Sequence, residues 1–258
     1  METSAVLLLF AAGLAGGVVT AIVGGSSLIT FPALLAVGLP PIIANASNTV
    51  ATTPGNFAAG LADFGRLPRW DRSSVGLVVV AVAGSITGAA LLLLTPERAF
   101  TAMVPALIGL ATILFGLSDR IRGWLTSPSS AAQGATMPSE ALRLLLFAPV
   151  AVYGGYFGAG MSVMILAVLS ISLTHEFRAI NVLKNLLAGL TGVVAIVVFV
   201  VQGMVAWAPA MVMMAGGLAG GVLGGRLVRV LPPRLVRGIV LAAGAVLTAV
   251  YAWRYWGP

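Results

Sequence analysis

The stretch Gly24-Gly25-Ser26-Ser27 separates two apolar runs near the start of the chain, and Gly158-Ala159-Gly160 separates two more past its middle. The run after each interruption, at 27–39 and at 161–173, is about 13 residues long, or about 20 Å as an α-helix. A bilayer core of about 30 Å needs about 20 helical residues. Both short runs are therefore predicted to be broken or re-entrant helices.

The composition of the whole chain is that of an integral membrane protein. Of 258 residues, 59% are hydrophobic and 8% are charged, and the mean hydropathy is +1.07, whereas soluble domains carry about 25% charged residues. The apolar runs are continuous, unlike the alternating strands of a membrane barrel. We therefore expect an all-α polytopic membrane protein. Its ten hydrophobic segments are 4–23, 27–39, 42–64, 74–94, 99–118, 140–157, 161–173, 179–201, 208–229 and 235–256.

Basic residues are distributed unequally between the two sides of these segments. Arg98 and Arg254 fall on one side, and the other side receives Arg66, Arg69, Arg72, Arg120, Arg122, Arg143, Arg178, Arg226, Arg229, Arg234 and Arg237. Because cytoplasmic loops carry the excess of Lys and Arg, we expect a cell inner (plasma) membrane protein with both termini non-cytoplasmic. Residues 1–4 lack the basic region of a signal peptide, so we expect the first apolar run to be retained as a helix.

The two halves of the chain correspond in sequence. Gly24 aligns with Gly158 at an offset of 134, and Gly88 aligns with Gly224 at an offset of 136. Each half has five segments, an odd number, so the second half must be inverted relative to the first. We predict a first repeat over 1–125, a cytoplasmic linker over 126–139 and an inverted second repeat over 140–258, together one transport domain. Secondary transporters with inverted repeats bind substrate near the midplane.

Further motifs follow each interruption. They are Phe31-Pro32-Ala33-Leu34-Leu35, Gly38-Leu39-Pro40-Pro41 and residues 44–49 in the first half, then 155–160 and 178–185 in the second. With these motifs the chain resembles the TauE/SafE family, the sulfite exporter family, over nearly its whole length except the linker. The resemblance implies transport of sulfite, organosulfonates or related small sulfur-containing anions.

The two interruptions are the first candidate binding site. A helix that begins inside the membrane presents unpaired N–H groups and the positive end of its dipole, which together bind anions. The candidate residues are Gly24, Gly25, Ser26, Ser27, Gly158, Gly160 and Ser162. Ser26 and Ser27 could also cap the following helix. The alternative, glycine for helix packing and serine bonding its own backbone, stays open.

Polar residues on the third and eighth segments are the second candidate group. Asn45, Asn48 and Thr49 share one helix face by their spacing, as do Asn181, Lys184 and Asn185. Buried polar groups in a bilayer must face protein, water or substrate. Ordinary hydrogen bonding between helices is the alternative to substrate binding for each of them.

Lys184 is the only lysine of the chain, and it falls inside a predicted segment. An intramembrane cation suggests a functional site, here the counter-charge of an anionic substrate; the alternative is that the lysine reaches the lipid headgroups. All seven acidic residues fall at segment ends or in loops. Because cation carriers commonly place carboxylates in mid-membrane, an anionic substrate is favoured.

The predicted function is a secondary transporter of a small oxyanion with alternating access, and a passive anion channel of the same fold is the alternative. A remote alternative is an intramembrane hydrolase that uses Ser26 or Ser27 with His175, the single histidine. The expected partners are a small anion and the lipid bilayer, and a homodimer is left open. We expect no nucleic acid, cofactor or metal and no enzymatic activity.

Overall fold

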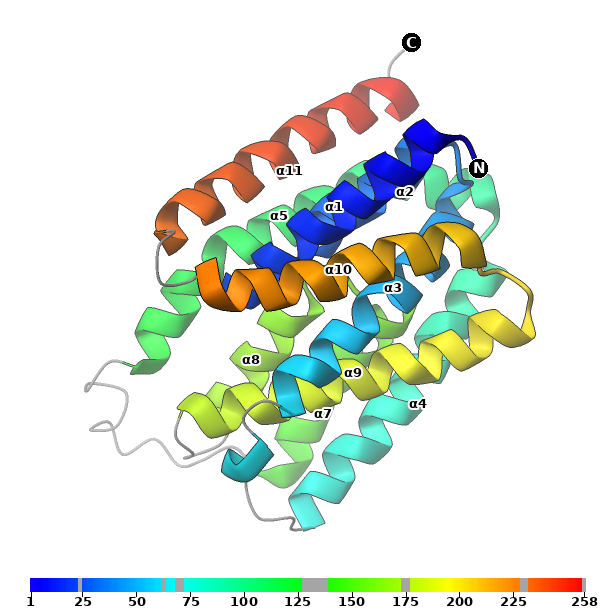
Figure 1. The fold of residues 1–258 in the computed structure, drawn as a ribbon. Coiled ribbons are helices and arrows are strands. Elements are labelled where there is room, and N and C mark those ends of the chain that lie inside the picture. Colours follow the sequence, from blue (N-terminus) through cyan, green and yellow to red (C-terminus); the bar gives the residue numbers. More distant parts are fainter. Residues whose placement is uncertain are drawn as a thin grey trace.

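The computed structural model of the chain describes residues 1–22, 25–61, 64–67, 72–126, 139–172, 177–227 and 232–256. Within these ranges it contains ten α-helices, the 3-10 helix η1 (Phe64–Arg66) and no strand (Figure 1). The α-helices are α1 (Thr3–Ile22), α2 (Ser27–Ala36), α3 (Pro41–Leu61), α4 (Arg72–Leu94), α5 (Glu97–Thr126), α7 (Glu140–Tyr156), α8 (Met161–Ser172), α9 (Phe177–Val201), α10 (Trp207–Leu227) and α11 (Pro233–Trp256). The predicted all-α fold is confirmed, and each predicted segment corresponds to one helix.

Helix lengths confirm a multi-pass membrane protein. In the described ranges α1, α4, α5, α9, α10 and α11 are long and apolar enough to cross a bilayer. By contrast, α2 has 10 residues and α8 has 12. The two short helices therefore follow the glycine interruptions, as predicted.

Most helix ends lie within three residues of the predicted segments, and the ends of α2 and α5 are two of those that differ. Helix α2 ends at Ala36 rather than 39, because Gly38 adopts φ +88° and its N–H and that of Leu39 bond back to Leu35 and Leu34. Bonds of this kind close a helix at a left-handed glycine. Helix α5 continues past 118 to Thr126, because an α-helix can extend beyond the apolar part that defines a membrane segment.

Glycine contacts join the first helix of each half to the fourth helix of the other half. A Cβ added at Gly17 or Gly220 would overlap the backbone of the partner helix in the α1–α10 pair, and one at Gly88 would overlap the Val152 carbonyl in the α4–α7 pair. Small residues permit such close approach between membrane helices. Under the predicted correspondence of the halves, these two helix pairs are equivalent.

The third helices of the two halves run antiparallel to each other, and so do the fifth helices. In the α3–α9 pair, Thr53 lies against Gly192 and Gly60 lies against Leu186, so residue numbers rise along one helix as they fall along the other. In the α5–α11 pair, Gly109 lies at Thr248 and Gly116 at Leu241. Corresponding helices that oppose each other in this way support an inverted repeat, which we retain as a prediction.

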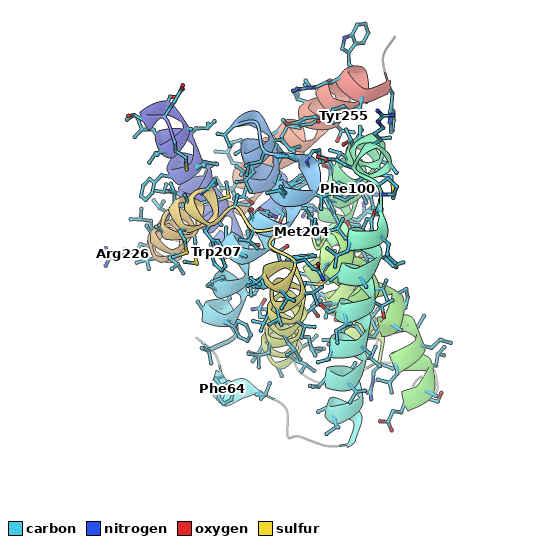
Figure 2. All side chains as sticks on the ribbon, turned by 90° about the vertical axis from the view of Figure 1, so that its right-hand side faces the viewer. Phe64, Phe100, Met204, Trp207, Arg226 and Tyr255 are labelled. Atoms are coloured by element: carbon cyan, nitrogen blue, oxygen red, sulfur yellow. The ribbon has the colours of Figure 1, made fainter. Side chains whose placement is uncertain are left out.

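Both termini lie at one end of the bundle, here called the terminus end (Figure 1). Helix α5 begins there and α11 ends there, so Phe100 and Tyr255 lie together, far from Phe64 (Figure 2). At the opposite end, here called the distal end, α1 and α10 finish and α4, α7, α9 and α11 begin (Figure 1). The membrane orientation of the protein is therefore defined by which of these two ends faces the cytoplasm.

Two arginines that we counted on the cytoplasmic side are buried within helices. Arg143 on α7 is 6% exposed and Arg237 on α11 is 9% exposed. Both lie inside the predicted segments 140–157 and 235–256, in the first two turns of α7 and α11. The arginine count therefore includes two side chains that do not project from loops.

Candidate functional site

A cavity of about 830 Å³ lies between the two short helices and their neighbours α1, α3, α5, α9 and α10. Eleven of the thirteen predicted site residues line it: Gly25, Ser26, Ser27, Asn48, Thr49, Gly158, Gly160, Ser162, Asn181, Lys184 and Asn185. Gly24 lies outside the described residues, and Asn45 is described but is not part of the lining. Residues from both halves of the chain are therefore brought to one cavity.

A shallower depression lies at the terminus end, between the start of α5 and the end of α11. It has a volume of about 710 Å³ and is lined by residues such as Glu97, Arg98 and Tyr255. None of its lining residues belongs to the short helices. The larger cavity is therefore the candidate site.

At the first interruption, the start of α2 is tied to α3. Gly25 adopts φ +92°, a conformation that favours glycine. The Asn48 side chain donates to the Ser27 hydroxyl at 3.2 Å and accepts from the Thr30 hydroxyl at 2.5 Å. Ser26 occupies the N-cap position with helical φ and ψ and makes no side-chain capping bond. The expected capping role of Ser26 is therefore wrong, and Ser27 bonds to a neighbouring helix instead.

At the second interruption, side chains bond to the backbone on either side of the glycines. Gly158 and Gly160 adopt φ +75° and +81°. The Tyr153 hydroxyl donates to the Ala159 carbonyl at 2.7 Å, and the Asn45 amide donates to the Tyr156 carbonyl at 2.9 Å. Asn45, 1% exposed, thus supports the interruption rather than lining the cavity.

Helix α9 contributes Lys184, one of the two cationic side chains in the lining; the other is Arg237 on α11. Asn181, Lys184 and Asn185 all line the cavity, as their shared helix face predicts. Asn185 is buried, whereas Asn181 and Lys184 are half-buried. Lys184 therefore forms part of the cavity wall together with the two asparagines.

The lining has the chemistry of an anion site. The first turns of α2 and α8 border the cavity, and the start of a helix combines N–H donors with a positive partial charge. The lining also contains hydroxyls, amides, Lys184, Arg237 and apolar side chains, and none of its described residues is acidic. In the described part of the chain, no group of His, Cys, Asp and Glu side chains could hold a metal ion.

Among the lining residues that the sequence reasoning missed are Phe115, Phe157 and Arg237. Phe157 directly precedes Gly158, so its position beside an interruption was a usable signal. Arg237 follows Pro233, which is a common first residue of a helix and could have indicated an arginine inside α11. Phe115 has no comparable signal, because its place depends on how α5 packs.

His175, which the hydrolase alternative requires, lies outside the described residues, as do residues 127–138 of the predicted linker.

Known proteins resemble the chain over most of its length. A family model described as "Sulfite exporter TauE/SafE" matches residues 9–251. A probable membrane transporter protein of Haemophilus influenzae is 27% identical over 94% of this chain and 92% of its own length. Probable membrane transporter protein YfcA of Escherichia coli K12 is 28% identical over 93% of this chain and 87% of its own length.

A probable membrane transporter protein of Xylella fastidiosa is 29% identical over 96% of this chain and 92% of its own length. No solved structure matches the chain. The family match extends over both interruptions and both halves of the cavity lining. The chain is therefore a multi-pass membrane transporter and belongs to the sulfite exporter TauE/SafE family.

Proposed function

We propose that the protein is a secondary transporter of a small oxyanion (sulfite, an organosulfonate or a related sulfur-containing anion) that binds near the midplane between the N-termini of α2 and α8. The observation that carries this proposal is the single cavity bordered by both helix starts and Lys184, with no acidic residue among its described lining. Two helix dipoles, the Lys184 ammonium group and the Arg237 guanidinium group, which also lines the cavity, favour a negative solute.

The shape of the cavity supports alternating access. Its exposed rim includes Ala21, Ala58 and Ala59, which lie near the distal ends of α1 and α3. Toward the terminus end, the buried Phe157 ring contacts Phe31, with centroids 5.2 Å apart, and Phe100 at 6.4 Å. A site that is accessible from one end and closed by packed rings at the other is one state of a carrier.

The proposal includes a membrane orientation. We place the distal end in the cytoplasm and both termini outside, in the cell inner membrane, because arginines concentrate at the distal end. The two repeats, over 1–125 and 140–258 and joined by the linker, would move relative to each other. This movement would close the cavity at the distal end and open it at the terminus end. The predicted inversion of the halves supplies the symmetry that such an exchange requires.

Flux of sulfite into liposomes that contain the purified chain tests the function. We expect saturable uptake by the unchanged protein and about a 10-fold or greater loss on Lys184→Gln, because a hydrogen bond to a charged group contributes about 1.5–3 kcal/mol. Arg226→Gln is the matched control: Arg226 is exposed and does not line the cavity, so uptake should stay unchanged.

Three other outcomes would change the conclusion. Uptake that does not saturate would favour the channel alternative. Unchanged uptake by Lys184→Gln would assign the lysine to the lipid headgroups. If none of sulfite, thiosulfate, sulfate, taurine and sulfoacetate were transported or raised the thermal stability of the protein, the anion proposal would be wrong.

A further inference from the structure

Helix α5 forms a wall that touches both interruptions. A Cβ added at Gly25 would lie 2.8 and 2.9 Å from two atoms of the Phe115 ring. A Cβ added at Gly160 would lie 3.4 Å from the Ala111 Cα and from Leu114. Phe115 and Ala111 are four residues apart and share a helix face. The same wall therefore presents a ring to the first helix start and a small side chain to the second.

Arg237 holds this ring from the neighbouring helix α11. Its Nη2 donates to the Phe115 carbonyl at 3.1 Å and to the Gly116 carbonyl at 2.6 Å. Its guanidinium carbon lies 5.9 Å from the centroid of the Phe115 ring, within cation–π range. A planar guanidinium is suited to such a combination of paired hydrogen bonds and ring contact.

The ring is buried as well as close to the site. Phe115 is 1% exposed and Arg237 is 9% exposed, and both line the cavity. Packed side chains of this kind resist displacement, because interiors are close to crystal density. A solute at the start of α2 must therefore fit beside Phe115 as it stands.

We propose that Phe115 is a specificity-determining residue that restricts the site to compact inorganic oxyanions and disfavours sulfonates with a carbon substituent. Arg237 is the positioning residue that keeps the Phe115 ring against Gly25. This inference rests on the proposed anion transport, and it narrows the substrate class. The predicted preference is for sulfite over methanesulfonate and taurine.

Competition in the liposome assay tests the inference. Uptake of labelled sulfite is measured in the presence of unlabelled sulfite, methanesulfonate or taurine. The selectivity ratio of each variant compares how strongly the sulfonate and unlabelled sulfite compete with this uptake. Phe115→Ala should shift the ratio toward the two sulfonates by roughly tenfold, a size typical of small changes in pocket volume. Phe147→Ala is the matched control, because Phe147 is fully buried and does not line the cavity; it should leave the ratio unchanged.

The positioning role of Arg237 is tested separately, by the selectivity ratio and the thermal stability of two substitutions. Arg237→Met should move the ratio in the same direction as Phe115→Ala, and Arg237→Lys, which keeps the charge but loses the planar fork, should lie between Arg237→Met and the unchanged protein. If Arg237→Met lowers thermal stability and leaves the ratio unchanged, the positioning role is wrong. A merely structural role would move stability alone.

The two proposals fail in different ways. If the unchanged protein transports no anion, the proposed function is wrong. If the unchanged protein transports sulfite and Phe115→Ala retains its ratio, this inference is wrong and the function stands. Should Phe115→Ala fail to fold, Phe115→Leu serves in its place with an expected shift of a few fold, and an unchanged ratio for that variant overturns the inference equally.

Discussion

The two interruptions have the same predicted role, yet the chain supports them differently. At the first, Asn48 bonds to two hydroxyl side chains on α2, and the Phe115 ring covers Gly25. At the second, Tyr153 and Asn45 bond directly to backbone carbonyls. The first interruption is thus held by side-chain packing and the second by bonds to the main chain. The start of α2 should consequently be more sensitive to added volume.

Gly25→Ala and Gly160→Ala test this difference with the largest expected effect. Both substitutions place a side chain at a positive φ, which costs about 1–3 kcal/mol. Only the Cβ at residue 25 also meets an aromatic ring, for which overpacking adds about 1–3 kcal/mol. Thermal unfolding in detergent should therefore show a clearly larger loss for Gly25→Ala than for Gly160→Ala.

One further variant controls for the glycine-to-alanine change itself, and a double substitution should restore part of the lost stability. Gly238 is an exposed helical glycine with open space at its Cβ position, so Gly238→Ala should leave stability unchanged or raise it by about 0.5–1 kcal/mol. Phe115→Ala combined with Gly25→Ala should recover part of the loss, because neighbouring residues are coupled. Equal losses at residues 25 and 160 would contradict the asymmetry.

Asn48→Leu should have an intermediate effect. The substitution removes the two bonds from the amide to Ser27 and Thr30, while the Thr30 hydroxyl keeps its bond to the Ser26 carbonyl. A typical intramolecular hydrogen bond contributes about 0.5–1.5 kcal/mol. Asn185 provides the comparison on α9, because it lines the cavity and its side chain makes no hydrogen bond to another described residue. Asn185→Leu should change the melting temperature less than Asn48→Leu, and the reverse order would show that the first interruption does not depend on this network.

Much of the fold was predictable from sequence, because long apolar runs and glycine interruptions directly reflect the bilayer thickness. Positions of polar residues along α3 and α9 were predictable as well, because helical periodicity assigns them to one face of each helix. The Phe115–Arg237 contact and the bond from Asn45 to Tyr156 were not, since each depends on how two distant helices cross. Periodicity placed Asn45 beside Asn48 and could not reveal which of them faces the cavity.

Tyr153→Phe should have the smallest effect and bears on the second interruption alone. It removes one bond, from the hydroxyl to the Ala159 carbonyl, and a typical intramolecular hydrogen bond contributes about 0.5–1.5 kcal/mol. The ring remains, so its edge contact with Phe157 at 6.4 Å is kept. Thermal unfolding should show a small loss, and Tyr255→Phe, at the terminus end, is the control for removing a hydroxyl. A loss as large as that of Gly25→Ala would mean that the second interruption, held through its main chain, is the more fragile of the two.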